Sequence, residues 1–246
     1  MNSINSHKST IENIEQRIEK YWDSRSTDFS RVRRIELEGV NAENWRDMLV
    51  KDLPAGKALK ILDVGTGAGF FAAILSKLGH KVTGVDMSAR MIDEAKKNLH
   101  DLKLDAEFFK MDAQALTFAD ESFDAVVTRN LTWTLPDVMQ GYREWKRVLK
   151  SGGVLINFDS DYGGRNFTRS DNGAHAEVTD KMLDECTEIK NSLRISTHKR
   201  PNWDVEFLQQ LGFTVQCDFD ISVKVHTDKN VPYDATPLFK ICATLI

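Results

Sequence analysis

The chain has 246 residues, a length that one α/β domain can fill, and 41% of them are hydrophobic, enough for a substantial core. Its 33 basic and 37 acidic residues give a formal net charge of −4, which argues against a chain-wide basic surface for nucleic acid. Cys186, Cys217 and Cys242 form no CxxC pair, and no apolar run approaches the ~18 residues of a membrane span. Without a recognisable signal peptide, we expect a cytoplasmic protein in a reducing compartment.

Two amphipathic helices are expected before the first strand, and together they predict a helical cap over residues 1–56. The first helix carries apolar residues at spacings of three or four, which predicts one buried stripe of Ile11, Ile14, Ile18 and Trp22. The second helix is predicted over residues 42–53, because a proline and a glycine follow and end it.

The most informative stretch is a buried strand that leads through a glycine turn into a helix. Ile61, Leu62 and Val64 form an apolar, partly β-branched strand, and Phe70 begins a segment with apolar residues at helical spacing. Gly65, Gly67 and Gly69 let the backbone approach a ligand closely, with the helix N-terminus pointing at it. Such a turn, at the carboxyl end of the first parallel strand, is where doubly wound folds bind nucleotide-like cofactors.

The spacing of the acid and the glycines distinguishes between cofactor classes. A dinucleotide fingerprint requires a third glycine or an alanine where this chain has Phe70. The chain instead places Asp63 ahead of Gly65, Gly67 and Gly69, all at alternate positions. This pattern resembles motif I of the class I S-adenosylmethionine-dependent methyltransferases that act on small molecules. The resemblance extends over about residues 58–160 and implies that S-adenosylmethionine is the cofactor.

The next two strands each end in an acid, as the resemblance leads us to expect. Lys81–Asp86 ends about 20 residues after the first acid, the offset at which an acid meets the ribose hydroxyls of a nucleoside. Ser88 is then expected to cap a helix that carries Met91. A short strand over residues 106–111 leads to Asp112. In the family an acid at this place binds the exocyclic amine of adenine, and a solvated loop acid is the alternative interpretation.

The fourth and fifth strands follow at the spacing of alternating strands and helices. Phe123–Arg129 is predicted as the fourth strand, and Pro136 as the first position of the helix after it. That helix has a basic last turn and a glycine stop, and Val154–Asp159 is predicted as the fifth strand. The turn between them resembles the family's Leu-Lys-Pro-Gly-Gly, with Ser151 in place of proline.

These landmarks predict an α/β fold, with a Rossmann-like, doubly wound seven-stranded sheet whose last strand is antiparallel. A single methyltransferase domain is expected, divided into the N-terminal helical cap, a cofactor-binding half (57–159), a substrate lid inserted after strand five (160–202) and a C-terminal part (203–246). The resemblance implies that the cofactor is held by Tyr21, Arg25, Asp63, Gly65, Thr66, Gly67, Gly69, Phe70, Asp86, Met87, Met91, Met111, Asp112, Ala113, Asn130 and Leu131.

The segment Tyr21–Phe29, expected between the two N-terminal helices, resembles a Tyr-Trp-x-x-Arg stretch common in small-molecule methyltransferases. Ser26 stands where alanine is usual. In that family the aromatic residue and the arginine, here Arg25, close over the methionine half of the cofactor. An arginine can hold a carboxylate bidentately, and an aromatic face suits a sulfonium cation. Packing alone is the alternative interpretation of the aromatic residues.

The C-terminal third is expected to hold a helix and turn over Val205–Phe213 and two strands over Thr214–His226 and Leu238–Ile246. The inserted lid contains a predicted helix with apolar residues and lies over the carboxyl end of the sheet, where acceptors bind in open α/β folds. Its last turn, His198–Arg200, is interpreted as a solvated basic turn, or as a contact for an acidic substrate. The apolar residues of the lid helix are Val178, Met182, Leu183 and Ile189.

Catalytic residues are weakly marked, because methyl transfer from a sulfonium is an in-line displacement that mainly requires alignment and exclusion of water. A general base is needed only where the acceptor must lose a proton. Asp159 and Asp161 are candidates to accept a proton or to hold an amine, and Trp133 to form an aromatic wall. Solvated acids and a packing anchor are the alternatives. The histidines have no metal-ligand spacing, so no metal site is expected.

We therefore expect a methyltransferase that transfers the methyl group of S-adenosylmethionine to a small-molecule acceptor. It is expected to act as a monomer or homodimer, without a nucleic-acid or membrane partner. One alternative keeps the chemistry but has RNA or protein as the acceptor, which would require a basic, open rim. Another is a regulatory protein that binds the cofactor without catalysis. No residue distinguishes O-, N-, S- or C-methylation.

Overall fold

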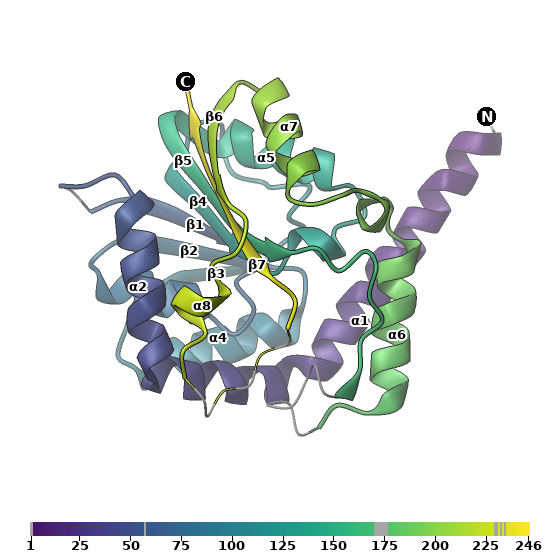
Figure 1. Cartoon of the computed structure of the whole chain (residues 1–246), viewed down its shortest axis with the longest axis horizontal. Helices are drawn as coiled ribbons and strands as arrows, with labels where there is room; N and C mark the ends of the chain where they lie inside the picture. The colour runs from purple at the N-terminus through teal and green to yellow at the C-terminus, as the bar shows by residue number, and fades with distance from the viewer. Residues whose placement is uncertain (1, 57, 170–176, 229–230, 232, 234) are drawn as a thin grey trace.

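A seven-stranded sheet forms the centre of the molecule, with the strand order β3-β2-β1-β4-β5-β7-β6 (Figure 1). The computed structural model describes residues 2–56, 58–169, 177–228, 231, 233 and 235–246. Strand β7 runs antiparallel to β5 and β6, and the other pairs are parallel, which confirms the predicted fold class. The strands are β1 (Lys60–Val64), β2 (Lys81–Asp86), β3 (Glu107–Lys110), β4 (Phe123–Arg129), β5 (Leu149–Ser160), β6 (Phe213–Asp218) and β7 (Leu238–Leu245).

The central strands are apolar on both faces because helices cover both sides of the sheet. Strand β1 pairs with β2 on one side and with β4 on the other, so the winding direction reverses between β1 and β4. In doubly wound folds ligands bind outside the carboxyl ends of the strands at such a reversal. The helices that flank the sheet are α3 (Phe70–Lys77), α4 (Ala89–Asp101), α5 (Val138–Val148), α7 (Asn202–Gln210) and the short α8 (Ser222–Val225).

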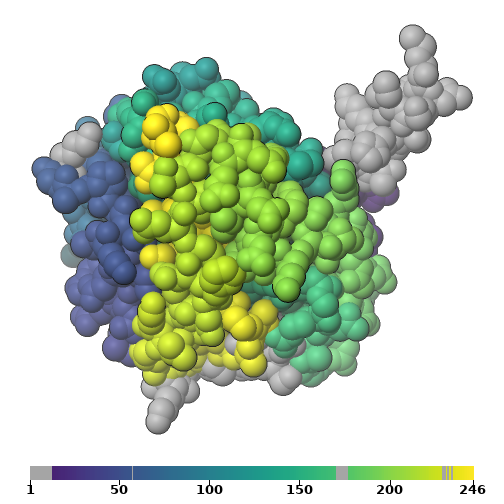
Figure 2. Space-filling view, turned by 45° about the horizontal axis from the view of Figure 1, so that its top comes forward, coloured from purple at the N-terminus to yellow at the C-terminus, as the bar shows by residue number. Residues whose placement is uncertain are grey.

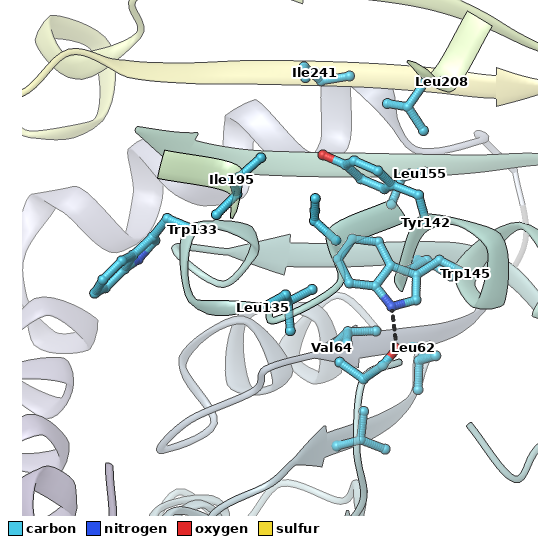
Figure 3. Close-up of a cluster of buried hydrophobic side chains, with 14 of the residues drawn as sticks. Leu62, Val64, Trp133, Leu135, Tyr142, Trp145, Leu155, Ile195, Leu208 and Ile241 are labelled. Atoms are coloured by element: carbon cyan, nitrogen blue, oxygen red, sulfur yellow. Dashed lines mark hydrogen bonds between the residues drawn. The ribbon is translucent and has the colours of Figure 1, made fainter. Parts of the chain in front are cut away.

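One apolar cluster packs α5 and α7 against the sheet, and its centre is shown in Figure 3. Tyr142 and Trp145 of α5 are fully buried there. The indole Nε1 of Trp145 donates to the carbonyl of Ala113 at 3.0 Å, the dashed line in Figure 3. A second cluster lies on the other face, where Trp45 packs edge-on against Phe71 at 5.3 Å between ring centroids. This buried hydrogen bond of Trp145 is one of those that tie the loop after β3 to α5.

The N-terminal segment is one continuous helix, α1 (Asn2–Glu38), followed by α2 (Val40–Asp52). The expectation that Tyr21–Phe29 lies between two helices is therefore wrong. No glycine or proline interrupts the chain before Gly39, so nothing in the sequence stops the first helix earlier. Helix α1 packs against α4, and α6 (Asp180–Ser192) lies beside it (Figure 1). One face of α1 therefore presents Tyr21, Trp22, Arg25 and Phe29 toward the carboxyl end of the sheet.

Two of the boundaries that differ from those predicted are set by short polar side chains. Pro136 is not the first position of α5, because Asp137 caps the helix by accepting from the Gln140 N–H at 3.0 Å. The strand expected over Thr214–His226 ends at Asp218, and Asp220 then accepts from the Ser222 N–H at 2.8 Å and begins α8. Short polar side chains that bond to a nearby N–H end strands and begin helices in this way.

The C-terminal third of the chain and α6 form one face of the molecule (Figure 2). Two 3₁₀ turns complete the described elements, η1 (Thr132–Thr134) after β4 and η3 (Arg194–Thr197) after α6. Cys217 and Cys242 are half-buried, whereas Cys186 of α6 is buried. Among the described helices, none combines the length and the hydropathy that crossing a membrane requires.

Candidate functional site

A cavity of about 220 Å³ lies at the carboxyl ends of β1, β2, β4 and β5, beneath α1 and α6. Gly69 is the one residue of the expected cofactor set that does not line it. It caps α3 with a φ of 83°, and a Cβ there would lie 3.2 Å from Ala95 of α4. Its role is therefore close packing of two helices. The expected cofactor residues that do line the cavity are Tyr21, Arg25, Asp63, Gly65, Thr66, Gly67, Phe70, Asp86, Met87, Met91, Met111, Asp112, Ala113, Asn130 and Leu131.

Asp63, at the end of β1, holds the glycine turn in shape. Its Oδ2 accepts from the Thr66 hydroxyl at 2.6 Å and from the Ala72 N–H at 3.1 Å. The carboxyl is almost completely buried, and this burial raises its pKa to about 7. Gly67 in the same turn has a φ of 52°, and a Cβ there would lie 3.2 Å from the ring of Phe29. The turn therefore requires glycine at this position because a side chain would be strained and would meet α1.

Asp86, at the end of β2, is oriented by two backbone donors. Its Oδ2 accepts from the Gly67 N–H and its Oδ1 from the Ser88 N–H, both at 2.9 Å. Ser88 in turn caps α4 by accepting from the Met91 N–H at 3.0 Å. Burial raises the pKa of Asp86 to about 6. The carboxylate is thus fixed between the glycine turn and the next helix, with a lining position in the cavity.

Asp112 belongs to a hydrogen-bonded wall that the sequence did not show in full. Its Oδ1 accepts from the backbone N–H of Gln114 at 2.9 Å and from the Gln114 Nε2 at 3.1 Å. The Gln114 Oε1 accepts from the Asp137 N–H at 2.6 Å, which links this wall to the start of α5. Gln114 itself lines the cavity and was missed, because nothing in its sequence context marks it.

Trp133 lines the cavity as part of a group of aromatic rings. Its ring packs edge-on against Tyr162 at 5.1 Å and against Trp22 at 6.5 Å between centroids. Phe167 approaches it at 5.3 Å. Only 7% of Trp133 is exposed, so the ring is both a packing anchor and a lining residue. Such a wall suits a planar or apolar ligand.

Asp159, by contrast, lies behind this wall and does not line the cavity. It is fully buried, and its carboxylate accepts from the Thr132 hydroxyl and from the Trp133 N–H. Burial raises its pKa, against the opposing charge of Arg200, whose Nη1 lies 3.5 Å from the Asp159 Oδ2. This geometry positions the turn that carries Trp133.

Asp161 also lies outside the cavity lining, because both of its oxygens face the backbone. Its Oδ1 accepts from the Gly163 N–H at 3.1 Å and its Oδ2 from the Arg200 N–H at 3.2 Å. The basic stretch His198–Arg200 is not simply a solvated turn. Only 2% of the Arg200 side chain is exposed, and its Nη2 lies 2.8 Å from the Asp204 Oδ1. Neither expected role, the solvated turn or the contact for an acidic substrate, describes Arg200.

Tyr21 and Arg25 of α1 line the cavity together, one turn apart. The Arg25 Nη1 donates to the Tyr21 hydroxyl at 2.7 Å, and 5% and 6% of the two residues are exposed. Burial raises the pKa of Tyr21, so the hydroxyl is neutral. Cys186 of α6 lines the same region.

Another basic group of lining residues was missed by the sequence analysis. It consists of Arg33 of α1, Arg129 at the end of β4, and His226 and Tyr233 from the segment before β7. A signal for Arg33 was available, because it lies two helical turns beyond Arg25 on what is one continuous helix. No comparable signal marked the residues that come from the end of β4 and the distant C-terminal segment.

Comparison with known proteins identifies the central part of the chain. Residues 62–157 match a family model described as a methyltransferase domain. Demethylmenaquinone methyltransferase from Staphylococcus aureus (strain MRSA252) is 31% identical over 153 residues, which are 61% of this chain and 60% of that protein. The chain therefore spans about 60% of the length of the curated relatives it matches.

Two solved structures share the fold at lower identity. A SAM-dependent methyltransferase from Aquifex aeolicus has a TM-score of 0.59 and 18% identity, with coverage of 88% of this chain and 98% of that one. The Haemonchus contortus phosphoethanolamine N-methyltransferase 2, solved in complex with S-adenosyl-L-methionine, has a TM-score of 0.62 and 18% identity. Coverage there is 89% of this chain and 57% of that one.

Proposed function

We propose that this chain, which contains a domain of the class I S-adenosylmethionine-dependent methyltransferase family, transfers a methyl group from S-adenosylmethionine to a small-molecule acceptor. The observation that carries the proposal is the single cavity at the strand ends. It brings the glycine turn, Asp86, Asp112 and Arg25 together from four separate parts of the chain. A glycine-rich turn without a ligand would not need these groups to converge.

The residues present fit the cofactor. In this proposal Asp86 accepts from the two ribose hydroxyls, and Asp112 accepts from the exocyclic amine of adenine. Arg25, buried and with its Nη1 held by Tyr21, binds the carboxylate of the methionine half. The buried Nε of Arg25 has no partner among the described residues, which is consistent with a site built for an anion.

Catalysis in this proposal consists of alignment and exclusion of water. S-adenosylmethionine, when bound, supplies a methyl group on a sulfonium that is already activated for in-line displacement. The aromatic wall around Trp133 excludes water and restricts the orientation of the acceptor, which lowers the entropic part of the barrier. Asp159 acts as a positioning residue, since its carboxylate accepts from the backbone N–H of Trp133 and does not line the cavity.

Two observations favour a small molecule over RNA or protein. The curated relative at 31% identity is named for demethylmenaquinone, a small acceptor. Arg200, one of the few clustered basic residues that could have formed an open rim, is buried and paired with Asp204. A macromolecular acceptor would require exposed basic side chains around the opening.

Two measurements test the proposal. Calorimetric titration with S-adenosylhomocysteine reports cofactor binding, and incubation of a cell extract with methyl-labelled cofactor reports transfer. The extract is separated beforehand into small-molecule, RNA and protein fractions. Label in the small-molecule fraction supports the proposal, and label only in RNA or protein contradicts the acceptor class. Binding without transfer to any fraction would favour a regulatory protein that binds the cofactor.

A further inference from the structure

The basic group of Arg33, Arg129, His226 and Tyr233 has no role in the cofactor site proposed above. All four line the cavity. They come from α1, from the end of β4, and from the segment between α8 and β7, so the fold assembles them from three distant parts of the sequence. Arginines in a largely apolar cavity are costly to bury unless a charge balances them.

One buried carboxylate, Glu36 of α1, balances part of this charge. Its Oε2 lies 2.6 Å from the Arg33 Nη1. Arg129 donates to the same carboxylate through both Nη atoms, from Nη2 to Oε1 at 2.9 Å and from Nη1 to Oε2 at 3.2 Å. The indole of Trp45 donates to the same Oε1 at 3.0 Å. Burial raises the pKa of Glu36, but the charges of Arg129 and Arg33 outweigh it and lower this pKa to about 2. Glu36 is therefore ionised and neutralises one of the two guanidinium groups.

The neighbouring residues His226 and Tyr233 do not neutralise the second guanidinium group. Burial and the charge of Arg129 lower the pKa of His226 to about 3, so the imidazole is neutral at physiological pH. Burial and the charge of Glu36 raise the pKa of Tyr233, so its hydroxyl is neutral as well. Burial lowers the pKa of Arg33, and the repulsion of Arg129 acts in the same direction. One positive charge at this end of the cavity thus remains uncompensated among the residues described.

Aromatic rings hold both arginines in place, and each arginine retains an N–H donor without a partner among the described residues. The guanidinium of Arg129 lies 4.3 Å from the Trp45 ring centroid and 4.8 Å from that of Phe70, and the guanidinium of Arg33 lies 5.0 Å from that of Phe29. The Nε atoms of both arginines are buried and have no hydrogen-bond partner among the described residues. Buried guanidinium groups with unpaired N–H donors are typical of sites that receive an anion.

We propose that Arg33 and Arg129 form an acceptor subsite that binds a carboxylate, while the aromatic wall around Trp133 receives the apolar body of the same molecule. The proposal rests on the proposed function, because it assigns the methionine carboxylate of the cofactor to Arg25. A carboxylate is the anion chosen because its planar, two-oxygen geometry matches the guanidinium fork of Arg33, while Arg129, whose two Nη atoms bind Glu36, adds positive charge. The acceptor is then a monocarboxylic acid with an aromatic or extended apolar part.

The test compares two probes of the same shape, phenylacetate and phenylacetamide, by calorimetric titration of the full chain. Each titration is made with and without saturating S-adenosylhomocysteine. The variants are Arg33→Gln and Arg33→Lys, with Arg34→Gln as the matched control. Arg34 is the next residue of the same helix, and its side chain is 46% exposed and paired with Asp101 at 3.3 Å.

We expect the wild type to bind phenylacetate about tenfold or more tightly than phenylacetamide, since a charge-assisted pair distinguishes them. Arg33→Gln removes this preference, Arg33→Lys retains part of it, and Arg34→Gln leaves it unchanged. Affinity for S-adenosylhomocysteine stays within about threefold of wild type in all three variants, which also shows that they are folded.

Equal affinity of the wild type for the two probes overturns the proposal. So does a loss of S-adenosylhomocysteine affinity in Arg33→Gln as large as the loss for phenylacetate, because Arg33 would then hold the methionine carboxylate. Failure of the wild type to bind S-adenosylhomocysteine contradicts the proposed function instead. The titrations without S-adenosylhomocysteine still decide whether the basic end prefers a carboxylate.

Discussion

Replacement of Asp86 by Asn is the most direct test of the cofactor site, because it removes the charge and retains the shape. Two ribose hydroxyls that donate to a carboxylate contribute about 1.5–3 kcal/mol each, and one neutral hydrogen bond to the Asn oxygen recovers about 1 kcal/mol. The net loss of about 3 kcal/mol corresponds to about a hundredfold weaker binding of S-adenosylhomocysteine. The Asn oxygen can retain only one of the two backbone N–H groups that now orient the carboxylate at 2.9 Å each, because its amide nitrogen cannot accept from the other.

The same residue predicts a pH dependence. Burial raises the pKa of Asp86 to about 6, and only the ionised form accepts from both hydroxyls as assumed above. Cofactor affinity in the wild type should therefore fall as the pH is lowered through about 6, and be about tenfold weaker at pH 5 than at pH 8. The Asp86→Asn variant has no group to protonate here, so its affinity should change little over the same range.

Isothermal titration calorimetry at several pH values measures both effects. Asp93→Asn is the matched control, because Asp93 is an exposed acid on the adjoining helix α4. Circular dichroism melts establish that each variant is folded. An affinity of Asp86→Asn within about threefold of wild type at pH 8 would refute the assignment of the ribose to Asp86. A pH profile that persists in the variant would show that another group titrates.

Three further changes test the rest of the site. Trp133→Ala should weaken phenylacetate binding about tenfold by removing the aromatic wall, and leave S-adenosylhomocysteine affinity nearly unchanged, in the same calorimetric titrations. Trp145→Phe should lower the free energy of unfolding by about 2 kcal/mol, measured with urea, because it leaves the buried Ala113 carbonyl without its donor. Asp63→Asn should gain thermal stability relative to wild type between pH 4 and pH 8. Burial raises the folded pKa of Asp63 to about 7, above its unfolded value, so the wild type loses stability as the pH rises through this window.

The geometry of the glycine-turn end of the cavity could be predicted from the sequence because its determinants are local. The strand, the glycine turn and the helix of residues 61–77 fix where Asp63 and Gly67 lie, and the next strand brings Asp86 beside them by parallel pairing. Period and turn chemistry establish each of these elements from a few neighbouring residues. Gly69 shows the limit of the pattern, since it serves helix packing and not the cavity.

The remaining features depend on tertiary contacts that no short pattern contains. Asp159 was expected at an open strand end, but Arg200 from 41 residues later covers it and pairs with it at 3.5 Å. The basic end of the cavity requires Arg33, Arg129 and Tyr233 to meet, and these come from three elements far apart in the chain. A charged residue that is distant in sequence from its partner resembles any solvated residue until the fold is known.

The strand-end acids of the cavity lie inside the segment that matches the family model, and most of the cavity's basic residues lie outside it. This difference limits what a relative's name implies about the acceptor of this chain. The acids at the ends of β2 and β3, Asp86 and Asp112, lie inside residues 62–157, the part that matches the family model. Of the basic end, only Arg129 lies inside that part, whereas Arg33, Tyr233 and their counterion Glu36 lie outside it. The matched segment therefore contains the residues at the strand ends that we propose for the cofactor. The proposed acceptor subsite draws on α1 and on the segment before β7, so the acceptor class has to be measured on this chain itself.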